Sequence, residues 1–302
     1  MKKIINSIIG YALFAALFLT ACSSATTGND DTVKVLASTT FLADIAQNVA
    51  GDRLTVESLL PVGADPHAYQ AAPSDVAKIA ESDLLILNGV EYEHFIEPLL
   101  ENAGGERLII AASNGLQANT IDEDGVQVGD PHMWLDPIRV IEYVKNIRDG
   151  LAQVDPAGTA VYDANAETYI AQLKELDAWI MKQVDTIPVE RRLLVTNHEA
   201  MGYFAERYGF TVVDTILPSF SSEASASAQE IAASIELVKD SDAPAIFLGD
   251  IENTDLADQI AAETGVKVVN DLHLESLTDG APAATYIDMM KHNVTQIVYG
   301  LK

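Results

Sequence analysis

The tripeptide Asp-Pro-His occurs twice in this chain, once in VGADPHAYQ, where it ends at His67, and once in VGDPHMWLDP, where it ends at His132. Proline fixes its own φ angle and pushes the preceding residue toward extended backbone, so each tripeptide is a stiff bracket that presents the imidazole after it. Two unrelated turns that end in histidine would show the same letters, and the tripeptide alone therefore does not define a site. A rigidly presented imidazole is nevertheless well suited to binding a metal ion.

Two further polar residues follow apolar runs that are typical of β-strands. His198 comes directly after the end of RRLLVTN, and Glu275 lies in the loop after GVKVVND. In open α/β sheets, ligands bind beyond the carboxyl ends of the strands, and this is where His67, His198 and Glu275 are expected. His132 lies in the loop that closes the first half of the chain.

Three imidazoles and one carboxylate suit zinc or a neighbouring divalent transition metal, whereas calcium and magnesium prefer oxygen ligands throughout. Four protein ligands fill a tetrahedral shell and leave no position for a catalytic water, so this set indicates binding rather than catalysis. Two of the four residues come from each half of the sequence. An ion held by all four would therefore join the two halves.

The other histidines, His94, His273 and His292, have weaker claims. His94 lies at an expected helix start and His292 in the expected C-terminal helix, and both are interpreted as structural or surface residues. His273 stays open, because residues 273 and 275 of an extended segment point the same way. The letters HEAMG from His198 resemble the start of the zinc-protease motif H-E-x-x-H, but Gly202 stands where the second histidine is required.

From residue 33 onward, short apolar runs alternate with helical patterns, which predicts βαβ units and mostly parallel sheets. The same alternation restarts after Pro188. The sequence therefore predicts two α/β lobes, each with a mostly parallel four-stranded sheet flanked by helices. The predicted strands are residues 33–38, 54–60, 83–89 and 107–112 in the first lobe and residues 191–197, 209–216, 244–250 and 265–271 in the second.

A long helical pattern bounded by Pro156 and Pro188 lies between the lobes. Its apolar residues recur at alternating spacings of four and three, which indicates one buried stripe on a helix. The stripe consists of Tyr162, Ala166, Tyr169, Leu173, Leu176, Ile180 and Val184. Some 28 residues would make a rod of roughly 40 Å, so we expect a rigid connector rather than a hinge. The expected organisation is an N-terminal lobe over 33–154, a connecting helix over 155–188 and a C-terminal lobe over 189–302.

The N-terminus is typical of an exported lipoprotein. Residues 1–21 combine a positive start, an apolar run that is short for a membrane span, and small residues at the end, as in a signal peptide. The run closes with LTAC, which resembles the lipobox in which the cysteine becomes the lipid-bearing N-terminus of the mature protein. That residue is Cys22, the only cysteine in the chain, and residues 22–32 would form a flexible lipidated tether.

Charge narrows the range of partners. The 302 residues include 45 acidic and 18 basic ones, which gives a formal net charge of −27. Such a charge repels nucleic acid and anionic membrane surfaces and attracts cations, although an acidic surface also serves simply to keep a protein soluble. The P-loop sequence G-x-x-x-x-G-K-[ST] does not occur, which excludes ATP hydrolysis through that motif.

Nearly the whole stretch after the tether resembles the metal-binding lipoproteins of bacterial ABC importers for zinc and manganese. These solute-binding proteins have two α/β lobes joined by one long rigid helix. The likeness rests on VLASTTFLADIAQNVAGD, LLPVGADPHAYQAAPSDVAKIAESDLLILNG, DPHMWLDP, VTNHEAMGYFAERYG and GAPAATYIDMMKHN. It implies that His67, His132 and His198 are metal ligands and that a carboxylate in the place of Glu275 is the fourth.

The resemblance also implies a function. The protein would not be an enzyme, but would capture a divalent metal ion outside the cytoplasm, at the cell surface or in the periplasm, and deliver it to a membrane permease. A lipid on Cys22 would hold it to the membrane, and we expect it to act as a monomer. Asp65 and Asp130 are expected to accept the second ring N–H of their neighbouring imidazoles, since ligating histidines usually donate that proton.

Two departures from the family pattern bear on the metal. Family members usually have an aspartate as the fourth ligand, and here Glu275 is preferred over Asp271, His273 and Asp279 for that place. The stretch NTIDEDGVQVGDPH lacks the histidine-rich loop of many zinc members, whereas manganese members typically have a glutamate where this chain has His198. Because more nitrogen in the ligand set favours zinc, we predict zinc, with manganese as the alternative.

Two other classes of protein could use such a metal site. A secreted metallohydrolase would need an open metal position and a nearby base such as Glu199 or Glu223. A surface protein for cell adhesion would use the metal only structurally.

Overall fold

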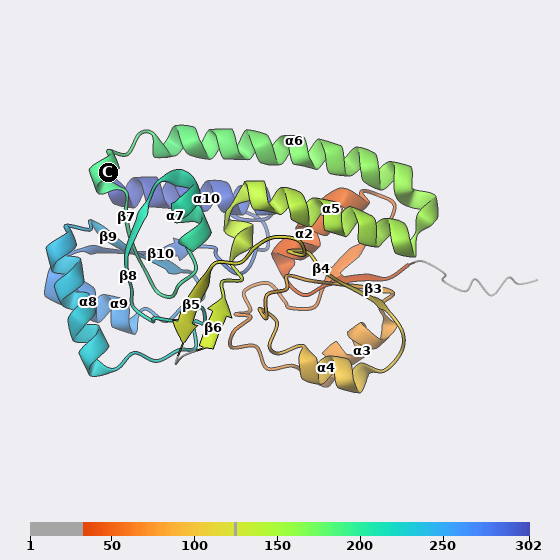
Figure 1. Cartoon of the computed structure of the whole chain (residues 1–302), viewed down its shortest axis with the longest axis horizontal. Helices are drawn as coiled ribbons and strands as arrows, with labels where there is room; N and C mark the ends of the chain where they lie inside the picture. Colours follow the sequence, from red (N-terminus) through yellow and green to blue (C-terminus); the bar gives the residue numbers. More distant parts are fainter. Residues whose placement is uncertain (1–32, 124–125) are drawn as a thin grey trace, which may run out of the picture. The chain divides into compact units, whose positions relative to one another are not determined.

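The computed structural model describes residues 33–123 and 126–302, so the predicted signal peptide and the tether with Cys22 lie outside the described residues. From Val33 to Lys302 the chain forms one structural unit, which contains two four-stranded parallel sheets with helices around them (Figure 1). This arrangement agrees with the predicted α/β class. Within the described ranges, no helix has the length and apolar character that a membrane span requires.

The first sheet has the strand order β2-β1-β3-β4 and is parallel throughout. Its central strands β1 and β3 are almost entirely buried, as expected for parallel strands covered by helices on both faces. Its strands are β1 (Val35–Ala37), β2 (Val56–Ser58), β3 (Leu84–Leu87) and β4 (Leu108–Ala111). Its helices are α2 (Thr40–Ala50), α3 (Pro73–Glu81), α4 (Glu97–Ala103) and α5 (Pro137–Val154).

The second sheet has the order β10-β9-β7-β8 and is also parallel. Its strands are β7 (Leu193–Thr196), β8 (Thr211–Thr215), β9 (Ala245–Gly249) and β10 (Lys267–Leu272). Its helices are α7 (Gly202–Tyr208), α8 (Ala228–Ser241), α9 (Asp255–Thr264) and α10 (Tyr286–Leu301). Numbered within each lobe in chain order, both sheets read 2-1-3-4, so each reverses its winding between its first and third strands. Loops at such a reversal commonly build ligand sites.

All eight predicted strands occur, and a two-stranded antiparallel hairpin that was not predicted follows the first sheet in the chain. Its strands are β5 (Thr120–Glu123) and β6 (Val126–Gly129). The segment is acidic and has few apolar residues, so it lacks the alternation of apolar and polar residues that would predict strands. The sequence between β5 and β6 contains Asp-Gly, a strong hairpin signal that would have predicted the hairpin.

The long helix α6 (Thr159–Val184) spans 26 residues, or about 39 Å, and its predicted apolar stripe is buried along the whole length. It packs against α2 and α5 of the first lobe and against α10 of the second (Figure 1). The carboxylate of Asp177 accepts two hydrogen bonds of 2.8 Å from Arg207 and one of 3.0 Å from Tyr208. The helix is thereby fixed to both lobes, as predicted for a rigid connector.

One hydrophobic core runs through both lobes and along α6. At its centre, the Trp134 ring stacks on Phe41 with centroids 4.5 Å apart. Its indole N–H donates to the Leu274 carbonyl at 2.8 Å, and its own carbonyl accepts the Tyr286 hydroxyl at 2.6 Å. Separating the lobes would expose this core, so packing itself holds the ligand-bearing loops of the two sheets together.

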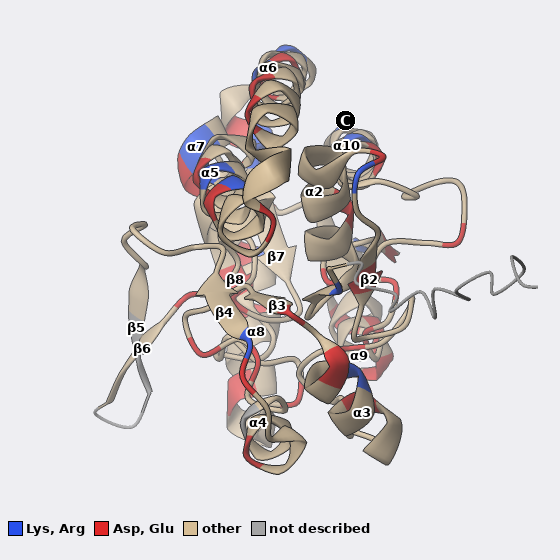
Figure 2. Ribbon diagram, turned by 90° about the vertical axis from the view of Figure 1, so that its right-hand side faces the viewer, with Lys and Arg blue, Asp and Glu red and all other residues tan. Residues whose placement is uncertain are grey.

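Charged residues follow the composition. Acidic positions occur on helices of both lobes, including α6 and α9, and Lys and Arg positions are fewer (Figure 2). The first turn of α9 carries Asp255 and Asp258, and no basic residue lies in its last turn. This charge raises the local concentration of cations around the protein.

Candidate metal site

The four predicted ligands lie on loops at the carboxyl ends of strands or just before a short helix. His67 follows β2, His198 follows β7 and Glu275 follows β10, while His132 precedes the 3₁₀ turn Met133–Leu135. The structure brings one nitrogen or oxygen of each residue within 4.8 Å of the others. Segments far apart in sequence thus converge at one point between the two sheets.

Four atoms, the Nε2 atoms of the three histidines and Oε1 of Glu275, lie close together in this cluster. Nε2 of His132 lies 3.3 Å from Nε2 of His198. Oε1 of Glu275 lies 3.4 Å from Nε2 of His132, 3.5 Å from that of His198 and 3.9 Å from that of His67. All four side chains are at most 6% exposed. Three imidazoles therefore direct the same ring nitrogen toward one carboxylate oxygen in a nearly dry environment.

Asp130 orients the second imidazole. Its Oδ1 lies 2.9 Å from Nδ1 of His132 and also accepts the backbone N–H of His132 at 2.9 Å. A proton held on Nδ1 leaves the Nε2 lone pair free to face the cluster. Asp65 behaves differently from the expectation, because it accepts the backbone N–H of His67 at 2.9 Å and the hydroxyl of Ser222 at 2.7 Å.

Glu252 has the same relation to the third imidazole, and the sequence analysis did not identify it. Its Oε1 lies 2.8 Å from Nδ1 of His198 in a buried ion pair, and its Oε2 accepts the backbone N–H of Gly249. Glu252 follows β9, and His198 follows β7, which is the strand next to it. The pair therefore lies where the second sheet reverses its winding, which is the one signal that would have found Glu252.

Tyr92 is a second residue that sequence reasoning missed. It follows β3, is buried, and donates its hydroxyl proton to Oε2 of Glu275. Among the described residues, neither Oε1 of Glu275 nor Nε2 of His67 has a hydrogen-bond partner. Buried polar atoms of this kind are normally paired, so two that face the same cluster suggest that a ligand completes it.

The cluster shifts the pKa values of its own members. Burial lowers the pKa of His67 to about 4. Burial also opposes charge on His132 and His198, but hydrogen bonds and charges from nearby carboxylates outweigh it, so both pKa values are raised. Conversely, burial alone would raise the pKa of Glu275, but His132 and His198 hold it well below its usual range. The surroundings therefore favour a charged carboxylate on Glu275 and protonation of His132 and His198, whereas they disfavour protonation of His67.

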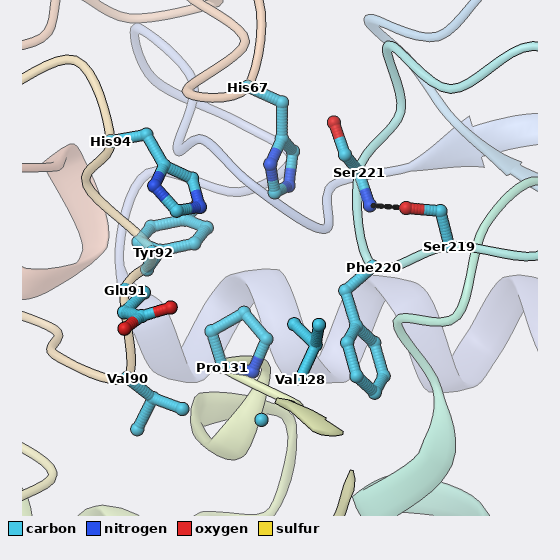
Figure 3. Close-up of a pocket in the computed structure, with 11 residues that line it drawn as sticks. His67, Val90, Glu91, Tyr92, His94, Val128, Pro131, Ser219, Phe220 and Ser221 are labelled. Carbon is cyan, nitrogen blue, oxygen red and sulfur yellow. Dashed lines mark hydrogen bonds between the residues drawn. The ribbon is translucent and has the colours of Figure 1, made fainter. Parts of the chain in front are cut away.

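A pocket leads from the surface to His67. Val90, Tyr92 and Phe220 are among its lining residues, and the His67 ring points into it (Figure 3). Val90 and Glu91 at its rim both have positive φ angles, 57° and 56°, which non-glycine residues seldom adopt. The remaining residues of the cluster lie deeper, so His67 is the predicted ligand nearest to solvent.

The other candidates lie outside this cluster. Asp271 and His273 belong to a separate group that also contains His292, and Asp279 is exposed. His94 is exposed, in agreement with its interpretation as a surface residue, and it lines the pocket that leads to His67 without belonging to the cluster. Glu199, a possible hydrolase base, accepts a hydrogen bond from the Thr215 hydroxyl at 3.0 Å instead.

Comparison with known families agrees with this arrangement. The model of the family described as "Zinc-uptake complex component A periplasmic" (ZnuA) matches residues 35–300. The chain belongs to this family. ZnuA-family proteins are metal-binding solute-binding components of ABC importers and are not enzymes.

Relatives within this family differ in the metal that their names state. The manganese-binding lipoprotein MntA of Halalkalibacterium halodurans is 35% identical, with 100% of this chain and 99% of the relative covered. The iron-binding protein YfeA of Yersinia pestis is 32% identical, with 95% and 93% covered. The solved structure of the periplasmic zinc-binding protein TroA from Treponema pallidum aligns with a TM-score of 0.82 at 27% identity, with 89% and 99% covered. The ZnuA-family fold is therefore common to proteins named for three metals.

Proposed function

We propose that this ZnuA-family protein captures a divalent transition metal ion with His67, His132, His198 and Glu275 and delivers it to the permease of an ABC importer. The distances within the cluster are the main support. A tetrahedron with metal–ligand bonds of about 2.0 to 2.1 Å has edges of roughly 3.3 to 3.4 Å. The measured contacts of 3.3, 3.4 and 3.5 Å lie close to that edge, and the 3.9 Å contact of His67 needs only a small adjustment.

Zinc is our preferred metal, with manganese as the alternative. Three imidazole nitrogens and one carboxylate oxygen form a set that favours zinc over manganese. The relatives named for manganese and iron keep the alternative open to test. Metal analysis of the protein purified without added metal, followed by competition between zinc and manganese, would decide between them.

The remaining parts of the proposal concern how the protein is held. Residues 1–21 would direct export, a lipid on Cys22 would anchor the mature chain, and residues 22–32 would let the lobes reach the permease. The relatives MntA of H. halodurans and PsaA of Streptococcus pneumoniae are both named lipoproteins, which supports the anchor. We propose that the protein acts as a monomer, with lobes 33–154 and 189–302 joined by the connector 155–188.

The test is a pair of ligand substitutions with a matched control. His67→Ala and His198→Ala should each weaken zinc binding by orders of magnitude, while far-ultraviolet circular dichroism shows that the lobes stay folded. His94→Ala removes an imidazole that lines the pocket but is not one of the four clustered residues, and it should leave the affinity unchanged. Wild-type affinity in either ligand variant would refute the assignment.

A further inference from the structure

A second group of metal-ligating side chains lies in the C-terminal lobe, apart from the cluster described above. Asp271 is in β10, His273 directly follows that strand, and His292 is in α10. One ligand atom from each lies within 4.8 Å of the others. Nothing in the proposed transport function uses these three residues.

His273 is the unusual member. It is 4% exposed, and neither of its ring nitrogens has a hydrogen-bond partner in the part of the chain that the structure describes. Its backbone is fixed on both sides by Asn293, which accepts its N–H at 2.8 Å and donates to its carbonyl at 2.7 Å. Its Nδ1 lies 3.0 Å from the Asp250 carboxylate. The ring is thus held in place by its backbone and by the contact of Nδ1 with Asp250, while Nε2 remains available.

His292 and Asp271 face this ring from the neighbouring helix and strand. The two imidazole centroids are 5.1 Å apart. Nε2 of His292 lies 2.7 Å from the carbonyl oxygen and 3.2 Å from the carboxylate of Asp271. Gln296 donates to the same carboxylate at 3.2 Å. Side-chain exposure rises from 5% at His273 through 13% at His292 to 56% at Asp271, so the group opens toward solvent.

A buried imidazole nitrogen without a partner, such as Nε2 of His273, costs on the order of 1 to 3 kcal/mol unless something pairs with it. Two imidazoles with one or two carboxylates form a ligand set for zinc and its neighbours. We propose that Asp271, His273 and His292, with Asp250 beside them, bind a second divalent transition metal ion. Because the group is partly open and has fewer imidazoles than the first cluster, this ion binds more weakly than the first.

The two sites share a segment of chain. His273 and Glu275 are two residues apart between β10 and α10, and both are buried. An ion at the second site fixes the start of the segment that carries Glu275. Occupancy of the second site depends on the concentration of metal. It therefore links that concentration to the segment that carries Glu275 in the first cluster.

The experiment is equilibrium dialysis of the wild-type chain against zinc from nanomolar to high micromolar concentration. The wild type should bind two ions per chain in two steps. His292→Gln should weaken the weaker step by at least about tenfold and leave the tighter step unchanged. Asp271→Asn, at an exposed position, should act in the same direction. Asp240→Asn removes an exposed carboxylate from α8 of the same lobe and should change neither step.

His67→Ala separates this proposal from the proposed function, because it should remove the tighter step and retain the weaker one. A wild type that binds a single zinc ion would overturn the second site. So would a weak step that His292→Gln and Asp271→Asn leave intact, since the ion would then be adventitious. Melting curves in chelator show whether each variant folds, and loss of the step in a folded variant supports the proposal.

Discussion

Replacement of Glu252 by glutamine tests whether the carboxylates behind the cluster matter for metal binding. The substitution keeps the shape of the side chain and removes its charge. The carboxylate lies 2.8 Å from Nδ1 of His198 and accepts the backbone N–H of Gly249. It therefore holds a proton on Nδ1, which leaves Nε2 of His198 available to an ion.

Glutamine cannot reproduce both contacts. If its carbonyl oxygen faces the Gly249 N–H, its NH₂ group faces Nδ1 of His198 and favours the tautomer with the proton on Nε2. If its NH₂ group faces Gly249, two donors oppose each other in a buried position. In either orientation, a charge-assisted contact is lost, and such contacts are about twice as strong as neutral ones.

The expected loss in zinc affinity for Glu252→Gln is about 10- to 100-fold, or roughly 1.4 to 2.7 kcal/mol. Competition with a chromogenic zinc chelator measures it. Glu199→Gln is the matched control, because Glu199 adjoins His198 in sequence but accepts from Thr215, and its affinity should stay within twofold of the wild type. An unchanged affinity in Glu252→Gln, or an equal loss in Glu199→Gln, would refute the reasoning.

Three other outcomes are expected. Zinc affinity should rise with pH from about 5 to above 7, because an ion must displace protons from His132 and His198. Nearby carboxylates raise the pKa values of both imidazoles despite burial. A competition titration that is flat between about pH 5 and 7 would contradict imidazole ligation. Tyr92→Phe leaves Oε2 of the buried Glu275 without its donor and should lower the free energy of unfolding of the metal-free protein by about 1 to 3 kcal/mol, measured by urea denaturation. Burial raises the pKa of Asp44 from 3.8 to about 6, so protonation of Asp44 stabilises the fold fully below pH 3.8, and this stabilisation is lost as the pH rises through 6. In chelator, the free energy of unfolding of Asp44→Asn should therefore increase relative to that of the wild type by up to roughly 3 kcal/mol between about pH 4 and 7. Parallel pH profiles of the two proteins would count against the shift.

The sequence was sufficient for the eight parallel strands and the connecting helix because each has a strong local pattern. The strands are short apolar runs, and α6 repeats its apolar residues at helical spacing. His67 and His132 were proposed because proline makes their surroundings stiff. His198 was proposed because it directly follows a predicted strand, and Glu275 because it lies in the loop after one. Three members of the cluster could be predicted because they lie where strands of the parallel sheets end.

The contacts behind the cluster could not be predicted in the same way. Glu252 meets His198 only because β9 pairs with β7, and the order of strands in a sheet is not a local property. Tyr92 reaches Glu275 from the other lobe, so its role depends on how the lobes pack. Asp65 shows the converse: the repeated tripeptide suggested the same role as Asp130, but its carboxylate binds backbone and Ser222 instead.

The shared core limits what can move when the metal binds. Opening the lobes would expose the stacked rings of Trp134 and Phe41 and break the hydrogen bond from Trp134 to Leu274, so adjustment must occur in loops. The distance from Nε2 of His67 to Oε1 of Glu275, 3.9 Å, is the longest of the four distances given for the cluster, and a tetrahedral edge is roughly 3.3 to 3.4 Å. His67 also lines the pocket.

A shift of His67 toward the ion carries Asp65 with it, because Asp65 accepts the His67 backbone N–H. Asp65 also accepts the hydroxyl of Ser222 in the loop before α8 of the second lobe, at 2.7 Å. Under the proposed function, a shift of His67 that completes the metal shell would therefore reach the loop before α8 in the other lobe. A permease that contacts both loops would sense the bound metal without any rotation of the lobes about α6.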